Sequence, residues 1–203
     1  MIRFIKIIFN AFLLVLAFVG FNAIGGEKYV EQVKIFVGDY IQELNMKTAQ
    51  KVGDFSNINE EFYIDKTANF MGYKAVMAEH KASGQKMMII DSGKKSLLTK
   101  NDIKSNEIDK KLTKLSEKIK YQGIRVQEVK VVKRGNMKVY DQNVPYAKFE
   151  AKVTKLPFSD VSGIVASVTA SDGSEKIALS VSEKKKYSQL IADEFYRGVK
   201  ENK

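Results

Sequence analysis

His80 is the only histidine in the chain, and a serine hydrolase needs such a base, held in place by a carboxylate. It follows Glu79 in residues 73–81, a stretch whose composition is typical of a strand. Neighbouring side chains of a strand point to opposite faces, so Glu79 is poorly placed to orient the imidazole. The chain also has no cysteine, which excludes a thiol nucleophile. The sequence therefore predicts no catalytic residue.

Four acidic residues between positions 54 and 65 could supply oxygen ligands to calcium: Asp54, Glu60, Glu61 and Asp65. The loop pattern D-x-[DN]-x-[DN]-G is absent, and we expect a solvated loop. One histidine and no cysteine exclude zinc sites built from several histidines or thiolates. We therefore predict no metal and no cofactor. Carboxylates far apart in the sequence can still meet in space, which leaves a carboxylate-based enzyme open as an alternative.

Basic residues are concentrated in residues 94–138, where 14 Lys and Arg stand against 5 acidic residues, a net +9 in a chain whose total is +10. On the helix predicted for residues 105–121, lysines recur every four residues opposite an apolar stripe. Two more basic residues adjoin Gly135, at the tip of a predicted hairpin. The apolar stripe consists of Ile108, Leu112, Leu115 and Ile119. We predict a basic binding surface formed by Lys110, Lys114, Lys118, Lys133 and Arg134.

A basic excess of this size suits anionic lipid, an anionic envelope polymer or a protein partner. Tyr121 is the only aromatic residue in the segment, whereas proteins that read nucleic acids generally stack several aromatic side chains on the bases. We therefore do not expect nucleic acid as the partner.

Residues 7–26 carry no charge and follow Arg3 and Lys6. A helix of this length spans roughly 30 Å, the thickness of a bilayer's hydrocarbon core. The pattern fits a signal anchor, but the strongest apolar run, residues 11–21, has the length of a signal-peptide core, and Ala23 and Gly25 fit a cleavage site. In both cases the N-terminus stays in the cytoplasm and the rest of the chain lies outside it. The domain is then periplasmic or otherwise extracytoplasmic, and it is anchored through residues 7–26 if these are not cleaved. Mass spectrometry of the mature N-terminus would distinguish the two.

The remaining pattern predicts one domain over residues 27–203. It begins with an amphipathic helix at 27–45, and the main sheet and helices occupy 73–201. Residues 146–153 alternate between apolar and polar, as in an antiparallel strand with one wet face. Turn signals at Ser83-Gly84 and Ser171-Asp172-Gly173 predict hairpins. The last helix is expected to bury one side, made of Tyr187, Leu190, Ile191, Phe195 and Val199.

These features predict an α+β fold, an antiparallel sheet built from hairpins with helices packed on it, preceded by the hydrophobic export segment at 1–26. The expected function is a membrane-targeted, extracytoplasmic, non-catalytic binding module. The alternatives are an envelope enzyme with a carboxylate site and a carrier of a lipid-like ligand. The carrier reading is suggested by the content of methionine and phenylalanine, at Met77, Met87, Met88, Phe149 and Phe158.

Overall fold

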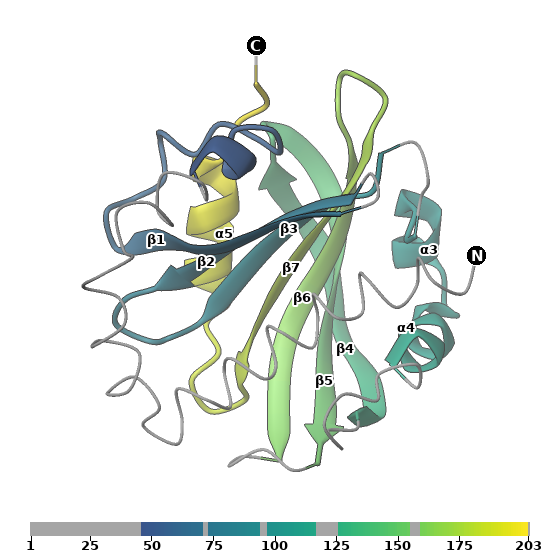
Figure 1. Cartoon of the computed structure of the whole chain (residues 1–203). Coiled ribbons are helices and arrows are strands. Elements are labelled where there is room, and N and C mark those ends of the chain that lie inside the picture. Colours follow the sequence, from purple (N-terminus) through teal and green to yellow (C-terminus); the bar gives the residue numbers. More distant parts are fainter. Residues whose placement is uncertain (1–45, 71–72, 94–96, 117–125, 155–158, 203) are drawn as a thin grey trace.

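Seven antiparallel strands form one sheet in the order β1-β2-β3-β7-β6-β5-β4 (Figure 1). The computed structural model describes residues 46–70, 73–93, 97–116, 126–154 and 159–202. The strands are β1 (Phe62–Phe70), β2 (Tyr73–His80), β3 (Lys86–Asp91), β4 (Val126–Val139), β5 (Gln142–Val153), β6 (Asp160–Thr169) and β7 (Glu175–Glu183). Two meanders, β1 to β3 and β4 to β7, therefore join side by side along β3 and β7. The predicted antiparallel sheet of hairpins is confirmed.

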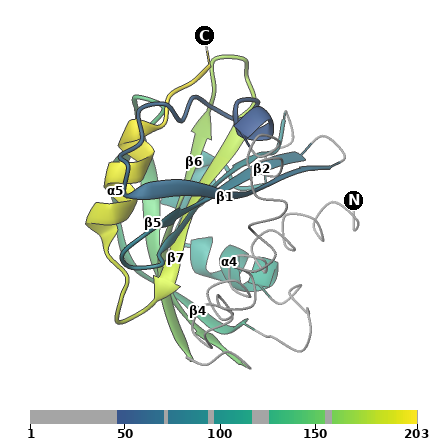
Figure 2. The same ribbon diagram turned by 60° about the vertical axis from the view of Figure 1, so that its left-hand side comes forward.

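The helices lie on both sides of this sheet, and Figure 2 shows α4 and α5 on opposite sides. The helices α3 (Lys100–Lys104) and α4 (Ile108–Ser116) connect the two meanders, with α3 against β5 and β6 and α4 against β4. The last helix, α5 (Gln189–Gly198), lies on the other face. We call the two faces the α3–α4 face and the α5 face.

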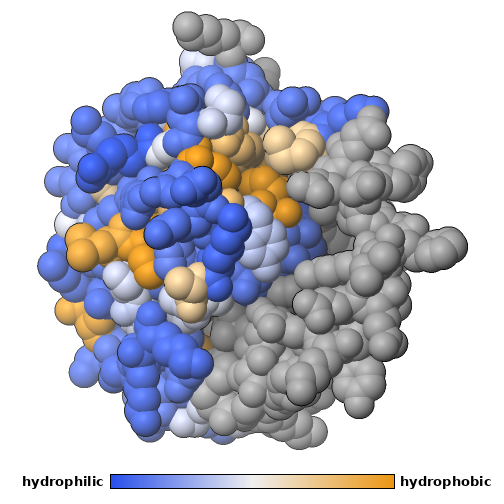
Figure 3. Space-filling model, turned by 90° about the vertical axis from the view of Figure 1, so that its left-hand side faces the viewer, coloured by the Kyte–Doolittle hydropathy of each residue, from blue (hydrophilic) through white to orange (hydrophobic). Residues whose placement is uncertain are grey.

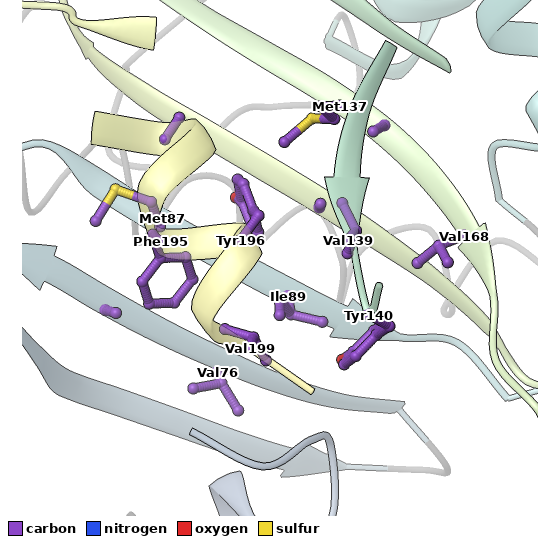
Figure 4. Packing of buried hydrophobic residues seen from close by; sticks show 14 of the residues in the cluster. Val76, Met87, Ile89, Met137, Val139, Tyr140, Val168, Phe195, Tyr196 and Val199 are labelled. Carbon is purple, nitrogen blue, oxygen red and sulfur yellow. The ribbon is translucent and has the colours of Figure 1, made fainter. Parts of the chain in front are cut away.

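Each face of the sheet carries its own apolar core, because strand side chains alternate between the faces. On the α5 face, Phe195 and Tyr196 pack against Met87 and Ile89 of β3 (Figure 4). The buried Tyr196 hydroxyl donates to the carbonyl of Met88 at 3.1 Å and accepts from its amide at 3.3 Å. On the α3–α4 face, Phe149, Val165 and Leu179 pack with the buried Ile103 and Ile108.

The helix predicted for residues 105–121 is shorter and is preceded by a second helix. Thr99 caps α3 through a capping box with Asp102, and the chain breaks at Ser105, whose backbone is extended. α4 then runs from Ile108 to Ser116. Ile108 is fully buried and Leu112 partly buried, as the predicted stripe requires. The rest of that prediction, from residue 117 on, lies outside the described residues.

The hairpin turn predicted at Gly135-Asn136 is wrong. β4 continues through these residues, and the turn lies at Tyr140 and Asp141, which both have positive φ and stand between the paired residues Val139 and Gln142. Two consecutive residues with positive φ make the tight turn that matches strand twist. Gly135 is needed for a different reason: a Cβ there would lie 2.8 Å from the ring of Tyr146 on β5.

Two further predictions are corrected by the structure. The loop expected around residues 54–65 ends in the edge strand β1, whose alternation is hidden because a bulge shifts the register between Ile64 and Lys66. In α5, Phe195 and Val199 are buried as predicted, but Leu190 is 79% exposed. Leu190 precedes Phe195 by five positions, so at ~100° per residue the two side chains lie about 140° apart around the helix.

Candidate functional site

A basic surface lies where α3 and α4 meet the edge strand β4. Lys110 and Lys114 are exposed on α4, as predicted. On β4, Arg134 donates to the carbonyl oxygen of Ser105 at 3.4 Å, and its guanidinium lies 3.9 Å from the Asp109 carboxylate. Arg134 thus joins the strand to the break between the two helices. We define the basic surface by Lys100, Lys104, Lys110, Lys111, Lys114 and Arg134.

The other predicted members are not placed on this surface. Lys133 pairs with Lys148 on the α5 face, while its neighbour Arg134 pairs with Ala147 of the opposite core. Lys133 interacts electrostatically with Asp193 of α5. Burial raises the pKa of Asp193, and interactions with Gln189, Arg197 and Lys133 lower it. Lys118 lies outside the described residues. The sheet therefore separates two residues that the predicted hairpin tip had brought together.

Each acidic residue of α3, α4 and the connection between them has a basic partner. Glu107 lies 3.5 Å from Lys110, Asp102 lies 2.5 Å from Lys111, and Asp109 faces Arg134. Burial alone would raise the pKa of Asp102, but hydrogen bonds from Lys111 and Thr99 lower it overall. Residues 100–116 contain five lysines and three acidic residues, and Arg134 raises the net charge of the surface to +3. The excess comes from Lys100, Lys104 and Lys114, of which only Lys114 belonged to the predicted set.

A second group of charges is buried inside the sheet, and the sequence did not reveal it. Lys86 of β3 is fully buried, and its ammonium contacts the Glu79 carboxylate of β2 directly and lies 3.8 Å from the Asp65 carboxylate of β1. The Tyr63 hydroxyl donates to the same Glu79 carboxylate at 2.7 Å. Burial lowers the pKa of Lys86, and the nearby carboxylates of Glu79 and Asp65 oppose this. We call Tyr63, Asp65, Glu79 and Lys86 the buried charge cluster.

The register explains how this cluster forms. Tyr63, Glu79 and Lys86 pair across β1, β2 and β3, and the same row continues through Val181, Gly163, Phe149 and Val131 to the other edge. One row of the sheet is therefore polar over three strands and apolar over four. The missing side chain of Gly163 leaves room for the Phe149 ring, because a Cβ at position 163 would lie 2.7 Å from that ring. Only strand pairing brings residues from three separate strands into such a row.

His80 does have a carboxylate partner, but it is Glu61 and not Glu79. Its Nε2 lies 3.2 Å from a Glu61 oxygen, and its Nδ1 lies 2.9 Å from the Ser83 hydroxyl. The order serine, histidine, carboxylate resembles a hydrolase triad. The backbone N–H groups around this serine are already engaged, however. Ser83 donates to His80 Nδ1, Gly84 to the His80 carbonyl, and Gln85 to the Ser83 hydroxyl. An acyl-transfer site needs such donors for an oxyanion, so this arrangement closes the β2–β3 turn.

Three of the four acidic residues considered for calcium are engaged elsewhere. Asp54 accepts the backbone N–H of Ser56 and Asp65 faces Lys86, while Glu61 lies beside His80. Within the described residues, no three histidine or acidic side chains are grouped closely enough to hold a metal ion. Among the same residues, no helix is both long and apolar enough to cross a membrane. The predicted export segment at 1–26 and the amphipathic helix at 27–45 lie outside them.

The residues that suggested a lipid carrier belong to two separate cores. Met77, Met88 and Phe149 are buried on the α3–α4 face, and Met87 is buried on the α5 face. Phe158 lies outside the described residues. Because the sheet separates the two groups, they do not line one common cavity.

Comparison with known proteins adds no family to this description. No protein-family model matches the chain, and no curated protein sequence matches it.

Proposed function

We propose that the protein is a membrane-targeted, extracytoplasmic, non-catalytic binding module that engages an anionic partner through its basic surface. The hydrophobic segment at residues 7–26, behind Arg3 and Lys6, supports the targeting. The binding role rests on one observation: Lys110 and Lys114 are exposed on α4, Arg134 of β4 contacts Ser105 at the start of that region, and the basic surface carries a net +3.

Stability does not account for this concentration of lysines. Exposed ion pairs contribute ~0–1 kcal/mol each, so the pairs formed by Lys110 and Lys111 stabilise the fold little. Lysines on an edge strand have a separate explanation, because charge there discourages pairing with other chains, and Lys130 and Lys138 of β4 fit it. Lys104, Lys110 and Lys114 stand on helices, where no strand edge needs protection.

The test is binding of fluorescently labelled polyphosphate to the full chain in a non-ionic detergent. Lys110→Glu/Lys114→Glu should weaken binding at least about tenfold, since each basic residue near a strongly anionic surface contributes ~1 kcal/mol. Binding by the unchanged protein should also fall steeply as salt is added, because salt shortens the screening length.

The matched control is Lys130→Glu/Lys152→Glu, which changes the net charge equally on the α5 face of β4 and β5. It should bind polyphosphate nearly as well as the unchanged protein. Equal losses from both variants would mean that only total charge matters, and no loss from Lys110→Glu/Lys114→Glu would reject the basic surface as the binding site. Far-ultraviolet circular dichroism verifies that each variant is folded.

The enzyme alternative rests on the buried charge cluster, which contains two carboxylates close together. A catalytic pair uses one protonated and one ionised carboxyl group. Here both Asp65 and Glu79 face the ammonium of the same lysine. Both carboxylates are also nearly inaccessible to solvent, with side chains 7% and 6% exposed. The geometry therefore favours a structural role for the cluster.

A further inference from the structure

The helices on the two faces of the sheet carry net charges of opposite sign. Residues 100–116, which contain α3 and α4, have a net +2 from five lysines and three acidic residues. α5 has a net −1, from Arg197 against Asp193 and Glu194. These helices cover opposite faces (Figure 2). The charge difference therefore lies between the helices, and an anionic plane would attract α3 and α4 and repel α5.

We propose that the basic surface docks on the anionic head groups of the same membrane that holds residues 7–26. The inference rests on the proposed function and names its partner as lipid phosphate. The connection between the uncharged segment and the first described residue, Met46, is 19 residues long. Even fully extended, it reaches at most about 65 Å. When residues 7–26 are retained, the domain stays within this distance of the bilayer, so docking is an intramolecular event and needs only modest attraction.

The other lysine-rich area is a poorer match for such a plane. It lies on the α5 face of β4, β5 and the end of β7, and contains Lys130, Lys133, Lys148, Lys152 and Lys184. Lys152 lies 3.7 Å from Glu128 and Lys184 lies 2.6 Å from Glu150. Together with Asp160 and Asp193, four acidic residues stand against these five lysines and Arg197, which leaves +2 against the +3 of the basic surface.

Docking through α3 and α4 fixes which face the protein presents to the aqueous side. α5 would point away from the bilayer, with Leu190 79% exposed on its outer side. Among the residues coloured in Figure 3, hydrophilic ones predominate, and the apolar atoms lie in separate patches. Small separate apolar patches are usual on a surface in contact with water.

The absence of cysteine allows a direct test with single-cysteine variants of the full chain in lipid nanodiscs. Asn106→Cys places a fluorophore at an exposed position between α3 and α4, and Leu190→Cys places one on α5. Nanodiscs contain either phosphatidylcholine alone or phosphatidylcholine with phosphatidylglycerol, and both carry a quencher on a lipid head group. We expect several-fold stronger quenching at position 106 than at position 190 with phosphatidylglycerol, and a loss of this difference in phosphatidylcholine alone and at high salt.

Introducing Lys110→Glu/Lys114→Glu into the Asn106→Cys protein should abolish the extra quenching, and Lys130→Glu/Lys152→Glu should leave it. Equal quenching at both positions, or stronger quenching at position 190, would overturn the proposed docking. If Lys110→Glu/Lys114→Glu weakens polyphosphate binding while position 106 is not quenched, the binding function stands and the membrane is not its partner. If that variant changes neither measurement, both proposals fail.

Discussion

Among single residues, Lys86 is the most deeply buried charged side chain in the described part of the chain. Its ammonium is the cation between two almost fully buried carboxylates, Glu79 and Asp65. Lys86→Met retains most of the side-chain volume but leaves both carboxylates without this cation. We expect the free energy of unfolding, measured by urea denaturation, to fall by about 3–5 kcal/mol. Removing one partner of a buried ion pair leaves the other as a buried charge whose desolvation is no longer compensated.

The double variant Lys86→Met/Glu79→Leu is the control for this prediction. It removes the cation together with its closest anion, so it should be less destabilised than the sum of the two single variants. A loss below about 1 kcal/mol for Lys86→Met alone, the range of surface changes, would show that the cluster is open to water in solution.

At the scale of elements, α5 is held to the sheet by one narrow stripe: Ala192, Phe195, Tyr196 and Val199. Phe195 is 1% exposed and its ring lies 5.4 Å from that of Phe62 on β1. Phe195→Ala should therefore lower the free energy of unfolding by ~3–5 kcal/mol. Leu190→Ala, a change of similar chemistry on the exposed side, should alter it by less than about 0.5 kcal/mol in the same denaturation experiment. A larger effect at Leu190 than at Phe195 would contradict the packing of α5.

At the scale of the whole molecule, buried lysines and tyrosines determine how stability depends on alkaline pH. Burial lowers the pKa of Lys86 and Lys176. Between this lowered pKa and the ordinary lysine pKa of ~10.4, the unfolded chain binds more protons than the folded protein. The free energy of unfolding therefore rises with pH in that window. Burial raises the pKa of Tyr140, Tyr187 and Tyr196. Above pH ~10 the unfolded chain loses these tyrosine protons while the folded protein keeps them, so stability falls.

We therefore expect the contribution of these groups to the free energy of unfolding to rise as the pH approaches ~10 and to decline above it. Denaturation at a series of pH values measures the curve, and tyrosinate absorbance assigns the decline. Three of the nine tyrosines, at positions 140, 187 and 196, should ionise only when the protein unfolds. Ionisation of all nine near pH ~10 in a still folded protein would contradict the burial of these hydroxyl groups.

Features that depend on local pattern could be predicted from the sequence. The alternation in residues 146–153 correctly placed Ala147, Phe149, Ala151 and Val153 on one buried face of β5. Turn residues marked the β2–β3 and β6–β7 hairpins, where Gly84 and Gly173 have positive φ. The basic excess of residues 94–138 follows directly from the numbers of basic and acidic residues in that segment. Such signals are carried by residues a few positions apart, so no knowledge of strand pairing is needed to read them.

Features that depend on pairing between distant strands emerged only in the folded protein. It separated the neighbours Lys133 and Arg134 onto opposite faces and brought Arg134 to Asp109. It also supplied Glu61 as the partner of His80 and gathered Asp65, Glu79 and Lys86 from three strands. A bulge or a turn shifts register by one residue and thereby moves every following side chain to the other face. Which charges meet was therefore set by the register of the whole sheet, and no local stretch of sequence contains that information.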